Sequence, residues 1–231
     1  MTENIFEACI DRVFLPDYTN PLEAAANASK MWANGSKISV SFLDGARDVQ
    51  EKIMYYANQW SQYANIKFEF GNDPKSKIRI SFRESGSWSA IGTDCLRKDW
   101  FPPNTPTMNF GWLTPGLSDE KYSSVILHEF GHALGLIHEH QSPASGIDWN
   151  KTAVTKYFSG SPNYWDAETV ASNIFRRYTG TQTQYPHTAF DAKSIMVYPI
   201  AREWTNNGYR VEMNSVLSQA DKDFIRNLYR R

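Results

Sequence analysis

Three histidines and one glutamate within eleven residues carry the strongest chemical signal in this chain. Residues 128–138 read HEFGHALGLIH, with histidine at His128, His132 and His138 and with Glu129 after the first. Positions i and i+4 of a helix lie on one face, so His128 and His132 can hold one metal ion together. Imidazole nitrogen suits zinc, and a set of three protein ligands leaves a fourth position open, as catalytic zinc sites do. The pattern therefore predicts a catalytic site for one Zn²⁺ ion.

The third histidine is too far along a continuing helix to reach the same ion. His138 comes six residues after His132, and Gly135 lies between them. Glycine adopts the left-handed conformation at little cost, so we expect the helix to end at Gly135 and the chain to turn back. Histidines on an amphipathic helix can instead be core residues, but chance would then also have to supply Gly135 and His138. We therefore favour the zinc site.

Glu129 lies next to a predicted zinc ligand but is not expected to bind the metal. Zinc held by three neutral histidines keeps its charge and lowers the pKa of water toward 7. The Glu129 carboxylate would accept the proton of that water and deliver it to a leaving amine, acting first as general base and then as general acid. The predicted reaction is therefore hydrolysis of a peptide bond.

A second segment, FDAKSIMVYP, places a methionine and a tyrosine two residues apart. Together with the long histidine motif it resembles the metzincin clan of zinc metallopeptidases, and within that clan the astacin family, including its short bacterial and fungal members. The resemblance implies that Met196 forms the Met-turn beneath the metal. It also implies that Tyr198 binds zinc at rest and moves to stabilise the oxyanion of the transition state. The alternative for Tyr198 is a half-buried tyrosine in an ordinary turn.

The resemblance extends over residues 36–231. Glu139 follows the third histidine directly, as in astacins, and we expect it to be a structural anchor through a buried hydrogen bond. The ending LSQADKDFIRNLY, residues 217–229, is similar to the last helix of the family. The chain differs at Val197, where astacins usually have histidine, and its two cysteines cannot form the two disulfides of the animal members. Serralysins and matrixins are the next most similar groups of the clan.

Substrate binding is expected at a sheet edge and in a neighbouring pocket. The segment SWSAIGT resembles the edge strand that precedes the active-site helix in astacins. A peptide can add to such an edge as another strand, although an ordinary edge strand is the alternative. A pocket between the active-site helix and the segment after Met196 would select side chains. Arg202 could reach it and favour acidic residues, although we favour an ordinary surface position for this arginine. The residues expected to align the peptide are Trp88, Ser89, Ala90, Ile91 and Gly92.

The amino-terminal residues could keep the site inactive. A cysteine upstream of a zinc protease domain can bind the metal as thiolate, and astacins more often use an aspartate of a pro-segment. Cys9 and Asp11 are therefore candidates for latency. A Cys9–Cys95 disulfide or two free thiols are the alternatives that we favour, because no longer switch motif surrounds Cys9. The resemblance favours a secreted protein, although no signal peptide is visible.

Hydrophobic patterns predict a mixed α/β fold. Short alternating segments predict strands, and longer segments with apolar residues three and four apart predict helices. This order indicates a twisted, mostly parallel sheet with helices packed on one side, as in the zincin fold of the metzincins. The strands are expected near residues 38–42, 66–70, 78–82, 87–93 and 107–112, and the helices near 22–32, 46–64 and 118–135.

We expect one catalytic domain, residues 35–231, after an amino-terminal segment, residues 1–34, that is either a pro-segment or a tether. The third histidine divides this domain into an upper subdomain, residues 35–138, and a lower subdomain, residues 139–231. The lower subdomain is expected to be irregular and to contain the Met-turn. Its helices are expected near 151–158 and 165–176, and a last helix should begin with a capping box of Ser218 and Asp221.

Composition and charge argue against several other classes of protein. The chain has 231 residues, 41% of them hydrophobic, and a formal net charge of −1. Such a chain can bury one sizeable core, and neither nucleic acid nor an anionic membrane is an expected partner. No apolar run approaches the roughly 18–20 residues that a spanning helix needs. A protein or peptide substrate is the expected partner, and the chain is expected to be a monomer.

Two other interpretations share the histidine motif. A catalytically silent or latent protein could keep the zinc fold as a peptide-binding or toxin-like module. Such a protein would be free to lose the carboxylate of Glu129, which is present. A zinc amidase that acts on a non-peptide bond would have the same site and would be separated by substrate profiling. We favour a zinc-dependent endopeptidase.

Overall fold

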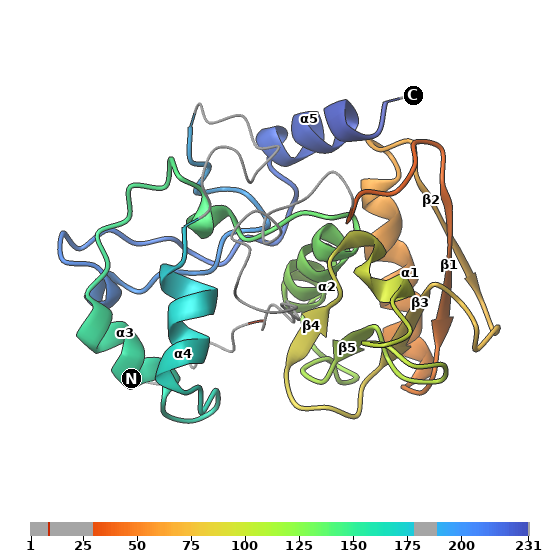
Figure 1. The fold of residues 1–231 in the computed structure, drawn as a ribbon, viewed down its shortest axis with the longest axis horizontal. Coiled ribbons are helices and arrows are strands. Elements are labelled where there is room, and N and C mark those ends of the chain that lie inside the picture. Colours follow the sequence, from red (N-terminus) through yellow and green to blue (C-terminus); the bar gives the residue numbers. More distant parts are fainter. Residues whose placement is uncertain (1–8, 10–29, 178–188, 231) are drawn as a thin grey trace.

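The molecule has two halves that differ in regularity, and the helix with the histidine motif lies where they meet (Figure 1). The computed structural model describes residue 9 and residues 30–177 and 189–230. A sheet with two long helices forms the first half. Short helices and long connecting segments form the second.

One sheet organises the first half. Its strands pair in the order β2-β1-β3-β5-β4, so β4 is an edge strand. All neighbouring pairs are parallel except β4 with β5. The mixed α/β fold with a mostly parallel sheet is therefore confirmed. The strands are β1 (Lys37–Phe42), β2 (Lys67–Gly71), β3 (Ile78–Ser81), β4 (Ser87–Ser89) and β5 (Met108–Phe110).

The strand predicted over residues 87–93 is shorter in the structure. Gly92 has a φ angle of 53°, in the left-handed region that favours glycine, and it begins the 3-10 helix η3 (Gly92–Leu96). An added Cβ at Gly92 would overlap the carbonyl oxygen of Lys30. The turn and the close approach of another backbone explain why the strand stops here.

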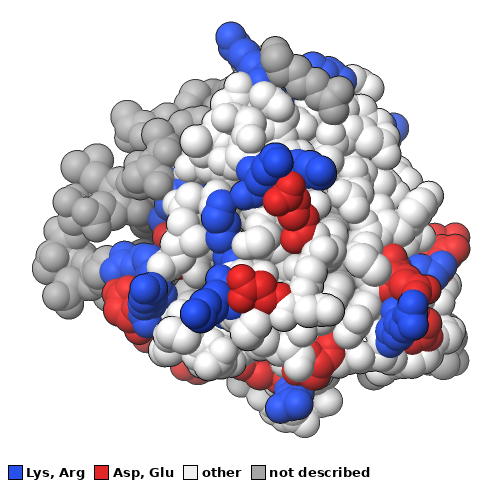
Figure 2. Space-filling view, turned by 90° about the vertical axis from the view of Figure 1, so that its right-hand side faces the viewer, with Lys and Arg blue, Asp and Glu red and all other residues white. Residues whose placement is uncertain are grey.

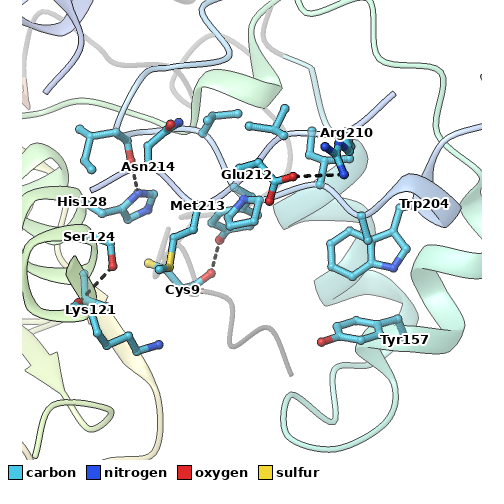
Figure 3. Close-up of a pocket in the computed structure, with 18 of the residues that line it drawn as sticks. Cys9, Lys121, Ser124, His128, Tyr157, Trp204, Arg210, Glu212, Met213 and Asn214 are labelled. Carbon is cyan, nitrogen blue, oxygen red and sulfur yellow. Dashed lines mark hydrogen bonds and ion pairs between the residues drawn. The ribbon is translucent and has the colours of Figure 1, made fainter. Parts of the chain in front are cut away.

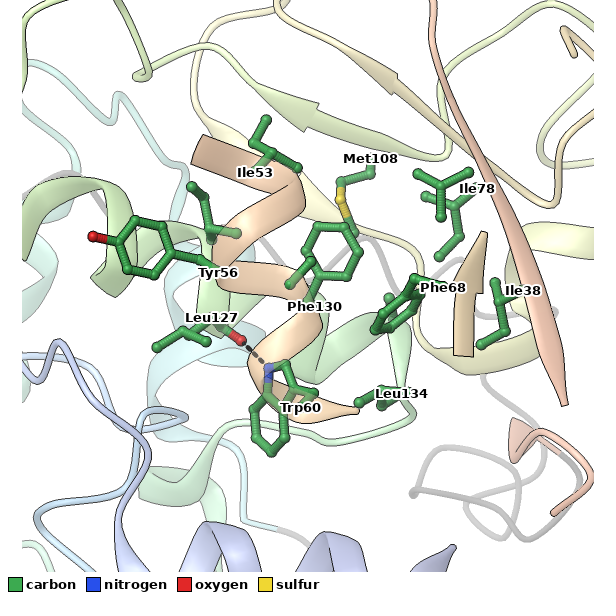
Figure 4. Packing of buried hydrophobic residues seen from close by; sticks show 14 of the residues in the cluster. Ile38, Ile53, Tyr56, Trp60, Phe68, Ile78, Met108, Leu127, Phe130 and Leu134 are labelled. Atoms are coloured by element: carbon green, nitrogen blue, oxygen red, sulfur yellow. Dashed lines mark hydrogen bonds between the residues drawn. The ribbon is translucent and has the colours of Figure 1, made fainter. Parts of the chain in front are cut away.

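Helices α1 (Arg47–Trp60) and α2 (Asp119–Ala133) pack on the same side of the sheet (Figure 1). The buried residues of α1 recur three and four positions apart, which is the pattern of an amphipathic helix. At its end, the indole Nε1 of Trp60 donates a hydrogen bond of 3.0 Å to the carbonyl of Leu127 in α2 (Figure 4). Phe130 of α2 lies edge-on to Phe68 of β2, with 5.0 Å between ring centroids. Aromatic packing thus fixes α2 against both α1 and the sheet.

Helix α2 is internal. Every residue from Tyr122 to Ala133 is buried, as expected for a helix enclosed on all sides. Ser118 caps its amino end by accepting a hydrogen bond of 3.2 Å from the backbone N–H of Lys121. A rigid, enclosed helix can hold side chains in fixed positions at the centre of the molecule.

The second half contains a separate hydrophobic cluster around Phe158, Trp165 and Trp204. The rings of Phe158 and Trp165 stack with centroids 4.9 Å apart. A helix predicted near residues 165–176 is found as α4 followed directly by one π-helical turn. The elements of this half are η4 (Glu139–Gln141), α3 (Lys151–Phe158), α4 (Ala167–Val170), the π-helix η5 (Ala171–Phe175), η6 (Arg202–Trp204) and α5 (Gln219–Leu228).

Residues near the two ends of the chain meet at the carboxyl end of α2. Trp32 is buried, and its Nε1 donates to the carbonyl of Ala133 at 2.8 Å. The hydroxyl of Tyr229 donates to the carbonyl of Leu134 at 2.8 Å and accepts from the backbone N–H of Trp32 at 3.3 Å. Lys30 forms an ion pair of 2.6 Å with Asp94. Most of the helix predicted near 22–32 lies outside the described residues.

The face on the right-hand side of Figure 1 carries charges of both signs interspersed on a mostly uncharged surface (Figure 2). Some charged side chains form ion pairs between strands or helices, for example Lys37 of β1 with Glu69 of β2. Among the described helices, none has the length and apolar character to cross a membrane.

Candidate active site

Three imidazole nitrogens converge at the carboxyl end of α2. The Nε2 atoms of His128 and His138 lie 3.1 Å apart, those of His128 and His132 lie 3.2 Å apart, and those of His132 and His138 lie 3.3 Å apart. All three residues are buried. The structure therefore brings the three predicted metal ligands together.

Backbone carbonyls fix the protonation of two of these rings. The Nδ1 of His128 lies 2.8 Å from the carbonyl oxygen of Ile195, and the Nδ1 of His132 lies 2.9 Å from that of Leu136. A carbonyl can only accept, so each Nδ1 carries the proton and donates it. Each Nε2 is then left with a lone pair for a metal ion, and the ring is held in orientation.

Gly135 makes the turn that places the third ligand. Its φ angle is 92°, and the N–H of Leu136 donates to the carbonyl of Gly131 at 3.0 Å, which closes the helix in the manner of a left-handed cap. The same turn presents the Leu136 carbonyl to His132. The predicted function of Gly135 thus has a visible geometric basis, and His138 reaches the other two histidines three residues later.

The residues fit a zinc ion. Ligand atoms at about 2.0–2.1 Å from a tetrahedral zinc are separated by about 3.3 Å, close to the distances between the three Nε2 atoms. The sulfur of Cys9 joins the group, and the four candidate ligand atoms all lie within 4.8 Å of one another. Neutral imidazoles with one thiolate are a ligand set that zinc prefers.

Cys9 is where the sequence interpretation needs correction. Of the two alternatives that we favour from the sequence, a Cys9–Cys95 disulfide is absent, because both cysteines are thiols and they lie in different hydrophobic clusters. The Cys9 thiol lies 3.4 Å from Oε2 of Glu129, in hydrogen-bonding range for sulfur. No local motif around Cys9 predicts a contact with a residue 120 positions away. Asp11, the other latency candidate, lies outside the described residues.

Glu129 is buried beside the histidines, with 1% of its surface exposed. Its carboxylate lies within hydrogen-bonding range of the Cys9 thiol, which belongs to the same group as the converging nitrogens. A carboxylate in this place can exchange a proton with a molecule bound between the histidines.

Tyr198 also contacts Cys9. Its hydroxyl donates a hydrogen bond to the backbone carbonyl of Cys9. The tyrosine ring lies 4.2 Å from the ring of His138 and 6.0 Å from that of His128, between centroids. The structure therefore places Tyr198 at the histidine site, with its hydroxyl directed at the amino-terminal segment.

Met196 is fully buried and lies close to α2 at Gly131, inside the histidine motif. A Cβ added at Gly131 of α2 would overlap the sulfur of Met196 and would lie 3.3 Å from Cζ2 of Trp60. The glycine inside the histidine motif thus makes room for the Met-turn. The spacing of the histidines does not predict this function of Gly131, although an isolated glycine within a helical pattern is a signal of close packing.

The Met-turn is tied to the last helix through Asp221. One carboxylate oxygen accepts from the Ser194 hydroxyl at 2.6 Å, and the other accepts from the backbone N–H of Ile195 at 2.8 Å. The second oxygen also closes the capping box with Ser218 at 2.9 Å. Burial raises the pKa of Asp221, while these hydrogen bonds lower it. The predicted capping box is present, and it also anchors the turn whose Ile195 carbonyl orients His128.

Glu139 is buried directly after the third histidine. Its Oε1 accepts a hydrogen bond of 3.1 Å from the backbone N–H of Asp191, which joins the chain after the site to the segment before the Met-turn. The backbone N–H of Glu139 donates to the carbonyl of Met196 at 2.9 Å. Burial raises the pKa of Glu139 to about 7, and the hydrogen bond from Asp191 opposes this.

The five residues from Trp88 to Gly92 lie at the edge of the sheet. β4 pairs with β5 on one side, and all five residues are buried. Substrate binding along this edge stays a prediction.

A cavity of about 610 Å³ opens from the histidines toward the second hydrophobic cluster (Figure 3). His128 and Cys9 lie toward one end of this cavity, and Tyr157 and Trp204 lie at the other (Figure 3). Glu129 is also among the lining residues. Arg202 is exposed, which agrees with the surface position favoured for it, and it is also among the lining residues of this pocket. The charged lining residues include Lys121, Arg202, Glu203, Arg210 and Glu212, of which Arg210 and Glu212 form an ion pair of 3.4 Å.

Solved structures similar to this chain point to one group of enzymes. A structure of myroilysin shares 46% sequence identity over 88% of this chain and 97% of its own, with a TM-score of 0.83. A crystal structure of myroilysin shares 42% identity over 98% and 100% of the two chains, with a TM-score of 0.68. High choriolytic enzyme 1, a hatching enzyme zinc-protease from the medaka fish Oryzias latipes, shares 18% identity over 87% and 94%, with a TM-score of 0.55, and supports the fold alone. No family model and no curated protein matches the chain.

The fold and the three-histidine site define a zinc metallopeptidase of the metzincin clan. The chain belongs to the astacin family, as myroilysin does, and the family resemblance seen in the sequence is confirmed. It is a zinc-dependent endopeptidase, and the interpretation as a silent binding module is not favoured.

Proposed function

We propose that the described structure is the latent form of this endopeptidase and that Cys9 keeps it inactive. The observation that carries the proposal is the position of Cys9, whose sulfur lies among the three histidine nitrogens and 3.4 Å from Glu129. The carbonyl of the same residue accepts from Tyr198. One residue thus engages the fourth ligand position, the base and the tyrosine together.

In the released enzyme, one zinc ion would be held by His128, His132 and His138. When bound, zinc supplies a Lewis acid that polarises the scissile carbonyl and makes water more acidic. Glu129 accepts the proton of the attacking water and delivers it to the leaving amine, for which its place beside His128 is suited. Tyr198, freed from Cys9, donates its hydroxyl proton in a hydrogen bond to the developing oxyanion.

The substrate is a protein or peptide, and we propose that it binds in two ways. Its backbone pairs with the edge formed by Trp88 to Gly92, which gives affinity with little sequence preference. One of its side chains enters the cavity that ends at Tyr157 and Trp204. The aromatic end favours a large apolar side chain, because burial of apolar area stabilises the complex. The enzyme is expected to act as a monomer.

The segment that carries Cys9 is proposed to end before Lys30 rather than after residue 34. Lys30 is paired with Asp94, and Trp32 is bonded to the end of α2, so these residues belong to the catalytic domain. A chain that starts at residue 30 is expected to be active and to hold zinc. A chain that starts at residue 35 lacks the Trp32 contacts and is expected to lose zinc more readily.

Cys9 and Cys95 provide a matched test of latency. We expect the full-length Cys9→Ala variant to cleave denatured casein without processing, and full-length Cys95→Ala to stay as inactive as the wild type. Zinc should be near one per chain in all three proteins, and a chelator should abolish the cleavage by Cys9→Ala. Equal activity of intact wild type and Cys9→Ala would refute latency through Cys9. Zinc-loaded Cys9→Ala without any cleavage would refute the assignment of Cys9 as the inhibitory residue.

A further inference from the structure

His140 is a buried histidine next to the site that neither the ligand set nor the proton transfer uses. Only 1% of its surface is exposed, and it lies in η4, two residues after the third ligand. Its ring lies 4.6 Å from the ring of Tyr198 and 5.2 Å from that of His138, between centroids. The plane of the His140 ring is inclined by 31° to that of Tyr198 and by 29° to that of His138, so His140 packs nearly face to face against both rings. A ring in this place limits where its two neighbours can go.

The π-helix η5 holds the His140 ring in place. Nε2 of His140 lies 2.9 Å from the carbonyl oxygen of Asn173 and donates to it, since a carbonyl can only accept. The amide of the adjacent Gln141 donates to the same carbonyl at 3.2 Å and to that of Ser172 at 2.8 Å. Two neighbouring side chains of η4 therefore bind two neighbouring carbonyls of η5.

These carbonyls are available because the helix ends there. The last carbonyls of a helix have no partner within it and must find one elsewhere. The final bond of η5 runs from the N–H of Arg176 to the carbonyl of Ala171, five residues back. The carbonyls of the next two residues, Ser172 and Asn173, accept from η4. Asn173 is itself fixed, because its amide donates to the carbonyl of Thr169 at 2.9 Å. A π-helical turn at a functional site is a recurrent device.

We propose that His140 is a positioning residue for Tyr198 and His138, anchored by the carbonyl of Asn173. The inference rests on the proposed function of Tyr198 as the oxyanion donor. A donor stabilises a transition state only when it is aimed before the reaction, and displacement of about 1 Å can cost about a hundredfold in rate. Once Cys9 has been removed from the site, the ring of Tyr198 packs against the His140 ring, which fixes its position.

The test is a double-mutant cycle between His140→Phe and Tyr198→Phe in the Cys9→Ala protein. Phenylalanine keeps a ring but removes the hydrogen bond to Asn173. We expect His140→Phe alone to lower kcat about tenfold with little change in KM, and to lower it less than about twofold when Tyr198 is already phenylalanine. Gln141→Ala is the matched control, because it removes the neighbouring bonds to η5 but no ring. The effects of Gln141→Ala and Tyr198→Phe on kcat should be additive.

A readout independent of turnover is the zinc dissociation constant, measured by competition with a chelator. His140→Ala removes the ring behind His138 and should raise this constant about tenfold, as loss of an outer support of a metal ligand does. Additive effects of the two phenylalanine variants, together with unchanged zinc affinity in His140→Ala, would overturn the proposal. A Tyr198→Phe enzyme with unchanged kcat would instead refute the proposed function of Tyr198, and with it any positioning through that residue.

Discussion

The two halves of the molecule hold their parts of the site by different means. In the first half, α2 carries His128, His132 and Glu129 on consecutive turns of a helix buried on every side. In the second half, Met196 and Tyr198 come from a segment without regular structure, which is held by the carboxylate of Asp221 and by the buried Glu139. Regular secondary structure fixes one set of groups, and individual side-chain hydrogen bonds fix the other.

This difference matches what each set has to do. Metal ligands must keep their distances within tenths of an ångström, and an enclosed helix provides such constancy. Under the proposed latency, Tyr198 exchanges one partner for another, since its hydroxyl is bonded to Cys9 in the described structure. A segment supported by a few side chains can permit that exchange, because its local stability is lower than that of the core helices.

The largest expected effects are losses of kcat, which compare one group from each half of the molecule. In the Cys9→Ala protein, Glu129→Gln should lower kcat about 10⁴-fold, because the general base is lost. Tyr198→Phe should lower it about 10²–10³-fold, because only one oxyanion donor is removed. Steady-state kinetics with a peptide substrate measures both, and zinc analysis should find about one ion in each variant. A larger loss from Tyr198→Phe than from Glu129→Gln would reverse the order of importance proposed here.

Glu139 should make the second half sensitive to pH. Burial raises the pKa of this carboxyl from 4.5 to about 7, so the folded state holds the proton more tightly than the unfolded state. The stabilisation from protonated Glu139 is complete below pH 4.5 and is lost as the pH rises to about 7. Relative to Glu139→Gln, the wild type should lose about 3 kcal/mol over this range.

Urea unfolding of both proteins at several pH values checks this, with zinc present and in a Glu129→Gln background so that self-cleavage is absent. The glutamine variant subtracts the pH dependence of the histidines, which is common to both proteins. A constant difference in the free energy of unfolding between pH 4.5 and pH 7.5 would show that Glu139 does not titrate in this window.

Gly131→Ala should show how tightly the halves are packed against each other. Alanine favours a helix over glycine by about 1 kcal/mol, but the added methyl group would overlap the sulfur of Met196. We expect a net loss of about 2 kcal/mol in the free energy of unfolding. Gly71→Ala, where an added Cβ meets nothing within 4 Å, is the control and should change stability by less than about 0.5 kcal/mol. Equal stability of the two variants would mean that the Met-turn can move away at no cost.

The smallest effects concern the helix caps. Ser118→Ala removes one cap bond from α2, and Ser218→Ala removes half of the capping box of α5, each at a cost of about 1 kcal/mol. We expect Ser218→Ala to cost more and to weaken zinc binding slightly, because Asp221 in the same box also holds the Met-turn. Thermal unfolding and chelator competition measure the two quantities. A greater cost for Ser118→Ala would indicate that the first half depends on its caps as much as the second does.

The sequence predicted those parts of the fold that depend on local periodicity. The alternation in β1 and the apolar spacing in α1 follow from burial of one face, and both elements are found near their predicted positions. The spacing of the three histidines predicted their convergence, because a helix and one glycine turn determine it.

Other parts depend on contacts between distant residues and leave no periodic pattern. Cys9 meets Glu129 across 120 positions, and Asp221 meets Ser194 across 27. The π-helix η5 was predicted as an ordinary helix, because its last carbonyls are directed by partners in η4 rather than by its own sequence. These contacts form only when the two halves pack against each other. The sequence therefore predicts them only through isolated signals such as Gly131.

The meeting of Trp32 and Tyr229 at the end of α2 has a consequence for biosynthesis. The turn that places the third zinc ligand is bonded to residues almost 200 positions apart in the chain. We therefore expect a nascent chain to complete this turn only once Tyr229 has left the ribosome, so stable capture of zinc should be a late step. Loss of either the Trp32 or the Tyr229 contact should accordingly be detected first as loss of metal.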